Sequence, residues 1–137
     1  MTTPFRIGQL DHVVLRVREM ERMIAWYGEV LGCPVDKRQD QFGMVHLRAG
    51  AALIDLVDVN GPLGREGGPP AGETGHNLDH FALRIDPFDP AALRAHFAAQ
   101  GIDPGDVKER YGAAGTGPSI YLRDPEGNRV ELKGPSR

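Results

Sequence analysis

Hydrophobic and polar residues alternate in two short, nearly identical stretches of the chain. The first reads LDHVVLRV at residues 10–17 and the second reads LDHFALRI at residues 78–85. Alternation with a period of two is typical of a β-strand that buries one face. His12 and His80 occupy the same position in the two copies. The sequence therefore predicts an internal repeat with two matching strands.

A helical pattern follows each copy. Residues 19–32 carry apolar side chains at helical spacing and end on Gly32, which is a typical C-terminal stop. Residues 89–101 begin with Asp-Pro, a capping residue followed by a first-turn proline. Strand patterns follow each helix, at residues 44–50, 52–59, 119–128 and 129–134. Each half thus predicts the order β-α-β-β-β, in which the strand directly after the helix is the least defined.

Glycine and proline mark the connections. Residues 60–77 hold six glycines and three prolines, which predicts a linker, or a lid over a site, between module one (about 8–59) and module two (about 78–134). Residues 110–119 hold three glycines and predict a surface loop or a closing segment. Asp-Pro-Glu-Gly-Asn at 124–128 predicts a tight turn. Residues 1–137 are expected to form a single domain of two modules.

The alternation of side chains along the strands places several polar groups on the face that does not pack on the helices. Among them are His12, Asp55, His80 and Glu131. Two imidazoles and two carboxylates in one cleft are a donor set for Zn, Ni, Co, Mn or Fe(II). A single such residue is more often structural, but matched pairs in a repeat favour a metal site. His46 shares this face as a supporting group or an alternative ligand.

Composition excludes other classes of function. The net charge is −3 with a pI of about 5.9, so we expect no nucleic-acid partner and no binding to anionic membranes. No apolar run is long enough to cross a bilayer, and the N-terminus lacks a signal-peptide pattern. Cys33 is the single cysteine, which we expect to be buried and free. These features predict a cytoplasmic protein.

The segments LDHVVLRV, IAWYGEVLG, LDHFALRI and SIYLRDPEGNRVEL, in this order, resemble the vicinal oxygen chelate superfamily. This superfamily includes glyoxalase I, the bleomycin- and fosfomycin-resistance proteins and the extradiol dioxygenases. The resemblance covers residues 9–133 and implies an α+β fold, in which two tandem βαβββ modules form a curved mixed sheet around a central cleft. It also implies one divalent metal ion per site, held by His12, Asp55, His80 and Glu131, and a homodimer that in some relatives shares each site.

The resemblance implies a glyoxalase I-like lyase or isomerase, similar to lactoylglutathione lyase, that acts through a metal-stabilised enediolate with glutathione as a candidate cosubstrate. Glu131 is the leading candidate base and Asp55 the second. Candidate substrate-binding residues on the cleft face are Arg16, Arg84, Arg123 and Tyr121. These four could instead form rim ion pairs or pack on the sheet.

Asp55 departs from the glyoxalase I pattern, which has glutamate at this position. Without Asp55 as a ligand, His12, His80 and Glu131 form the triad of extradiol dioxygenases and fosfomycin-type thiol transferases. These two reactions are therefore the alternative function. A non-catalytic protein that binds and sequesters a small-molecule drug is a further alternative.

Overall fold

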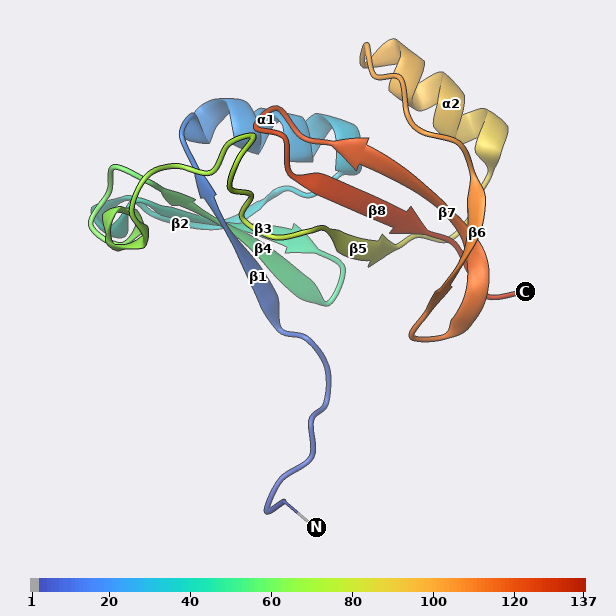
Figure 1. The fold of residues 1–137 in the computed structure, drawn as a ribbon, viewed down its shortest axis with the longest axis horizontal. Helices are drawn as coiled ribbons and strands as arrows, with labels where there is room; N and C mark the ends of the chain where they lie inside the picture. Colours follow the sequence, from blue (N-terminus) through green and yellow to red (C-terminus); the bar gives the residue numbers. More distant parts are fainter. Residues whose placement is uncertain (1–2) are drawn as a thin grey trace.

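The computed structural model describes residues 3–137, which form two modules with the same order of elements (Figure 1). Module one contains β1 (His12–Val17), α1 (Met20–Leu31), β2 (Val35–Gln39), β3 (Met44–Ala49) and β4 (Ala52–Asp58). Module two contains β5 (Phe81–Arg84), α2 (Pro90–Ala99), β6 (Lys108–Gly112), β7 (Gly115–Arg123) and β8 (Arg129–Lys133). The predicted order β-α-β-β-β is confirmed in both halves.

Each module forms one four-stranded mixed sheet. The strand order is β1-β4-β3-β2 in module one and β5-β8-β7-β6 in module two. The first strand of each module pairs in parallel with the last, and the remaining pairs are antiparallel. The predicted α+β class is therefore confirmed. Figure 1 shows both helices along one side of the molecule and the N-terminal residues extending away from the body.

The two modules share one hydrophobic core and are joined by polar contacts. Tyr27 of α1 is fully buried and donates its hydroxyl hydrogen to Asp124 Oδ2 of the turn between β7 and β8, at 2.8 Å. His96 of α2 lies 2.7 Å from the carbonyl oxygen of Val30, through its Nε2 atom. These contacts fix the helix of each module against the other module.

The predicted turn at residues 124–128 is confirmed, and it also holds the start of α1. Asp124 Oδ1 accepts hydrogen bonds from the backbone amides of Glu126 and Asn128, and Gly127 has a φ of 85°. The Glu126 carboxylate accepts hydrogen bonds from the backbone amides of Arg18 and Glu19 at 2.8–3.0 Å. A carboxylate is favourable there, because the first amides of a helix have no partner within it.

The prediction of a loop at residues 110–119 is wrong. Most of this segment belongs to β6 and β7, which pair from Lys108↔Ser119 to Gly112↔Gly115, so that only residues 113 and 114 connect them. The glycines serve close packing instead of loop flexibility: a Cβ atom on Gly117 would lie 2.5 Å from the carbonyl oxygen of Pro135. The segment is thus part of a hydrogen-bonded hairpin, and a closing role for it stays a prediction.

The linker between the modules is fastened to β1. It contains a short 3-10 helix, η2 (Gly64–Gly67), and the Arg16 guanidinium donates to the carbonyl oxygens of Gly64, Gly68 and Pro69 at 2.6–3.1 Å. Gly67 lies so close to Arg16 that a Cβ atom would be 2.4 Å from its Nε atom.

Among residues 3–137, no helix has the length and apolar character needed to cross a membrane.

Candidate metal centre

The first predicted pair of metal ligands lies on the first and last strands of module one. His12 opens β1 and Asp55 lies on β4, where the parallel register pairs it with Val14. The His12 Nε2 atom is 3.8 Å from Asp55 Oδ2. Asp55 is 3% exposed, although its side chain faces away from the helix. The side-chain alternation predicted from the sequence therefore brings this imidazole and this carboxylate together.

The second pair occupies the equivalent place in module two. His80 directly precedes β5, and Glu131 lies on β8 opposite Ala82. The His80 Nε2 atom is 3.3 Å from Glu131 Oε1, and Glu131 is 6% exposed. The two modules thus present the same arrangement of an imidazole beside a buried carboxylate.

An aspartate that directly precedes each of these histidines in the chain contacts the imidazole Nδ1 atom. Asp11 Oδ2 lies 2.8 Å from His12 Nδ1, and Asp79 Oδ2 lies 2.5 Å from His80 Nδ1. A carboxylate that holds Nδ1 leaves Nε2 free to bind a metal, which is the usual support of a ligating histidine. The signal was present in the sequence, because the repeated motif is Leu-Asp-His in both copies.

The four predicted ligands form two separate pairs. Within residues 3–137, no three His, Cys, Asp or Glu side chains converge closely enough to hold a metal ion together. Each module therefore carries half of the predicted donor set. We call these two imidazole–carboxylate pairs the first and second half-sites of the predicted metal centre.

The donor set of each pair fits a divalent cation. Because a metal–nitrogen or metal–oxygen bond is about 2.1 Å long, two ligands of one ion can lie up to about 4.2 Å apart. The separations of 3.8 Å and 3.3 Å fall within that reach. In the described part of the chain, neither carboxylate has a Lys or Arg within ion-pair distance. Among the described residues, Asp55 has only the histidines His46 and His12 at that distance, and Glu131 has His80. A metal ion would therefore supply the positive charge that each buried carboxylate lacks.

Arginine side chains flank the aromatic ring beside Glu131. Tyr121 of β7 lies opposite Glu131, and its ring is 4.4 Å from the guanidinium carbon of Arg110 and 4.7 Å from that of Arg129. The ring also meets His80 edge-on, with ring centroids 5.3 Å apart. Burial and the negative charge of Glu131 raise the pKa of the Tyr121 hydroxyl. Tyr121 is therefore a neutral hydroxyl group beside the second half-site.

Sequence reasoning missed both of these arginines. Arg129 lies on the same strand face as Glu131, so the alternation of side chains could have identified it. Arg110 was expected in a loop, and it lies over the Tyr121 ring because β6 pairs with β7.

The three arginines predicted to bind substrate have different surroundings. Arg16 uses its donors to hold the linker, as described above. Arg123 donates to the carbonyl oxygen of Gly127 at 3.0 Å, within the turn that follows β7. Arg84 is exposed at the end of β5. A substrate role for these residues stays a prediction.

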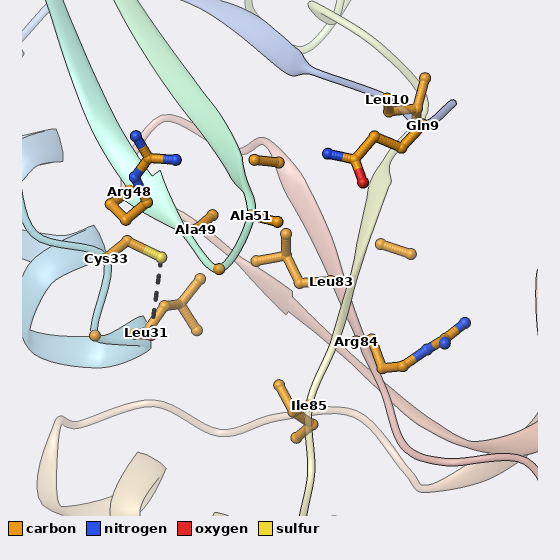
Figure 2. Close-up of a pocket in the computed structure, with 14 residues that line it drawn as sticks. Gln9, Leu10, Leu31, Cys33, Arg48, Ala49, Ala51, Leu83, Arg84 and Ile85 are labelled. Carbon is orange, nitrogen blue, oxygen red and sulfur yellow. Dashed lines mark hydrogen bonds between the residues drawn. The ribbon is translucent and has the colours of Figure 1, made fainter. Parts of the chain in front are cut away.

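A pocket of about 400 Å³ lies where the modules meet (Figure 2). Its lining includes Leu31 and Cys33 from module one and Leu83, Arg84 and Ile85 from module two. None of the four predicted metal ligands lines it. Cys33 is buried as expected, and burial raises the pKa of its thiol. This pocket is therefore separate from both half-sites.

Comparison with known proteins agrees with the fold and the repeated motifs described above. The sequence profile described as the Glyoxalase/Bleomycin resistance protein/Dioxygenase superfamily matches residues 9–132. The virulence protein STM3117 of Salmonella typhimurium is 32% identical over 127 residues, which cover 92% of this chain and 83% of that protein. Its crystal structure superposes with a TM-score of 0.78 and covers 96% of this chain and 99% of that chain.

Two other solved structures share the fold at lower identity. The fosfomycin resistance protein FosX of Listeria monocytogenes has a TM-score of 0.68 at 15% identity, with coverage of 96% of both chains. The lactoylglutathione lyase of Agrobacterium tumefaciens has a TM-score of 0.65 at 23% identity, again with coverage of 96% of both chains. The chain described here therefore belongs to the glyoxalase/bleomycin resistance protein/dioxygenase superfamily, the vicinal oxygen chelate superfamily expected from its repeated motifs.

Proposed function

We propose that this chain is a divalent-metal-dependent enzyme of the glyoxalase I type, a lyase or isomerase that acts on a small oxygen-rich substrate. The observation that carries the proposal is the pair of equivalent imidazole–carboxylate sites, each with a buried carboxylate that lacks a Lys or Arg partner in the described residues. The proposed ligands are His12, Asp55, His80 and Glu131. A bound metal ion would supply positive charge that stabilises negative charge developing on two neighbouring substrate oxygens.

Glu131 is the proposed base. One of its carboxylate oxygens takes a proton from the carbon atom next to the substrate carbonyl and returns it to the neighbouring carbon. Its low exposure of 6% keeps bulk water from exchanging with the transferred proton. Asp55, at the equivalent position of module one, is the second candidate for this role.

The proposed substrate carries a negatively charged group. Arg110 and Arg129 flank Tyr121, which lies opposite Glu131. Two guanidinium groups at one site favour a carboxylate or a phosphonate. The carboxylates of glutathione would meet this requirement, so we propose glutathione as the cosubstrate.

We also propose that the working form is a homodimer. Each described chain carries two half-sites that do not converge. A second copy could bring its module two against module one of the first, which would unite the donors into two complete sites. A closed twofold assembly of this kind uses both halves of both chains.

Metal analysis followed by a substrate panel tests the proposal. Native protein and His80→Ala are compared for bound metal, with His76→Ala as the matched control, because His76 lies in the linker. Native protein and the control should retain a divalent ion that His80→Ala loses. Methylglyoxal and glutathione are then supplied with Ni²⁺, Zn²⁺, Co²⁺, Mn²⁺ or Fe²⁺. Absence of turnover with every metal would refute the glyoxalase assignment.

A second candidate reaction is the opening of an epoxide by a thiol, as in fosfomycin-type transferases. The two guanidinium groups of Arg110 and Arg129 favour it, since they suit a phosphonate as well as a carboxylate. Turnover of fosfomycin with a thiol and Mn²⁺ would support this reaction, and turnover of a catechol with Fe²⁺ would support a dioxygenase. Drug sequestration without chemistry requires that the protein hold no metal and that His80→Ala leave ligand affinity unchanged.

A further inference from the structure

A chain of polar contacts crosses three strands of module one and ends at the first half-site. Gln39 Nε2, at the end of β2, lies 2.7 Å from His46 Nε2 on β3. His46 Nδ1 lies 2.7 Å from Asp55 Oδ1, and the two residues are direct partners in the register of β3 and β4. Asp55 Oδ2, the other carboxylate oxygen, faces His12. The imidazole of His46 is thus the link between Gln39 and the carboxylate.

The chemistry of the donors fixes the direction of these hydrogen bonds. The amide nitrogen of Gln39 can only donate, so His46 Nε2 must accept. A neutral imidazole that accepts at Nε2 carries its hydrogen on Nδ1. His46 therefore donates to Asp55 Oδ1 and occupies that oxygen, which leaves Oδ2 as the oxygen that is free to bind elsewhere.

Module two has a different arrangement at the equivalent position. Tyr121, and not a histidine, lies opposite Glu131 in the register of β7 and β8. Glu131 reaches to 3.3 Å from His80, whereas the shorter Asp55 stays 3.8 Å from His12. The imidazole of His46 therefore accompanies the shorter carboxylate and holds it in one orientation.

We propose that Gln39 and His46 are positioning residues that hold Asp55 through Oδ1 and direct Oδ2 toward His12, so that Asp55 binds metal through a single oxygen. This inference rests on the metal site of the proposed function. It assigns His46 as support for a ligand and not as a ligand, and it gives Gln39 a role. Loss of a group that orients a metal ligand typically lowers metal affinity by about 10–100-fold.

Two substitutions at one position separate orientation from packing. The amide nitrogen of Asn occupies the place of Nδ1 in histidine, so His46→Asn keeps a donor to Asp55 Oδ1, whereas His46→Leu removes it. We expect His46→Leu to weaken Zn²⁺ binding by roughly 10–100-fold, and Gln39→Leu to weaken it by less. The dissociation constant of His46→Asn should stay within about threefold of that of the native protein. Arg48→Met, on the same strand and face, is the matched control, because Arg48 pairs with Asp36. The readout is the Zn²⁺ dissociation constant against a chromophoric chelator.

Equal losses in His46→Leu and His46→Asn, or no loss in either, would overturn the proposal. A measurement on the native protein without metal tests the proposal even when a variant does not fold. Nitrogen NMR of the native metal-free protein should show the His46 hydrogen on Nδ1, and a hydrogen on Nε2 contradicts the proposed relay. If the native protein binds no divalent metal at all, the proposed function fails, and the NMR result still decides whether His46 donates to Asp55.

Discussion

Tyr27 illustrates how single residues hold the modules together. Its ring is fully buried in the shared core, and its hydroxyl donates to Asp124, which also accepts from the backbone amides of Glu126 and Asn128. Burial raises the pKa of the Asp124 carboxyl, while its hydrogen bonds from Asn128 and Tyr27 lower it. The carboxylate is therefore tolerated in the interior because several donors surround it.

Removing the Tyr27 hydroxyl should destabilise the protein. Tyr27→Phe keeps the ring and deletes one donor to a buried carboxylate, so we expect the free energy of unfolding to fall by about 1–3 kcal/mol at pH 7. Urea denaturation measures this change. Tyr111→Phe is the control, since Tyr111 is 85% exposed and should change stability by less than about 0.5 kcal/mol. Equal effects in the two variants would contradict the role of the buried contact.

The same residue predicts how stability depends on alkaline pH. Burial, followed by the nearby charge of Asp124, raises the Tyr27 pKa well above its usual value of 10.0. In the unfolded chain the hydroxyl ionises near pH 10, whereas in the folded protein it stays protonated. Stability from this group is complete below pH 10 and is lost as pH rises toward the folded pKa. Urea denaturation from pH 8 to pH 11 should therefore show a steeper decline for the native protein than for Tyr27→Phe.

At the scale of elements, strands and connections depend on close backbone approach. Gly117 of β7 packs against the C-terminal segment, where a Cβ atom would be 2.5 Å from the carbonyl oxygen of Pro135. Gly28 lies inside α1, and a Cβ atom there would meet nothing within 4 Å. The packing around Gly117 thus leaves no room for a side chain, whereas the surface around Gly28 has room for one.

Alanine at these two positions should have effects of opposite sign. Gly117→Ala forces the backbone of β7 away from Pro135, and we expect it to destabilise the protein by about 1–3 kcal/mol. Gly28→Ala fits the helix and should stabilise it by about 0.5–1 kcal/mol. Thermal and urea denaturation of both variants measure the difference. A neutral Gly117→Ala would show that the C-terminal segment can move aside without cost.

The Arg16 side chain makes several of the contacts that hold the linker against β1. Arg16→Met removes the donors to Gly64, Gly68 and Pro69. We expect faster cleavage after Glu66 and Glu73 by a Glu-specific protease, whose sites the substitution leaves unchanged. Arg48→Met is the control, because Arg48 pairs with Asp36 and does not touch the linker. Cleavage at the same rate in all three proteins would show that the linker is held by other contacts.

At the scale of the whole molecule, the two half-sites of one chain do not converge in the described residues. We therefore expect each complete metal site to be shared between two copies, and this expectation can be tested with mixed dimers. Each complete site would combine His12 and Asp55 of one copy with His80 and Glu131 of the other.

Mixed dimers test this arrangement. His12→Ala and His80→Ala should each lose metal binding when purified alone. In a refolded equal mixture, half of the dimers are mixed and each has one intact site, so about a quarter of all sites should bind metal again. Metal analysis after gel filtration measures the recovery. If the mixture binds no more metal than the two variants alone, a site shared between two copies is ruled out, even where the native protein binds metal.

Local sequence patterns determined the elements and the faces on which their residues lie. The tandem repeat, both helices and the strand faces on which His12, Asp55, His80 and Glu131 lie follow from side-chain periodicity, which depends only on the geometry of helix and strand. The Leu-Asp-His motifs carried the supporting aspartates as well, although their role became visible only from distances.

The tertiary structure alone decided contacts between segments that are distant in the sequence. Arg110 reached Tyr121 because β6 and β7 pair through a glycine-rich stretch that resembles a loop. His46 met Asp55 because the register of β3 and β4 places them opposite each other. Arg16 met a linker about fifty residues away along the chain. Periodicity states which way a side chain points, but the residue that it meets depends on strand register and on the packing of one module against the other.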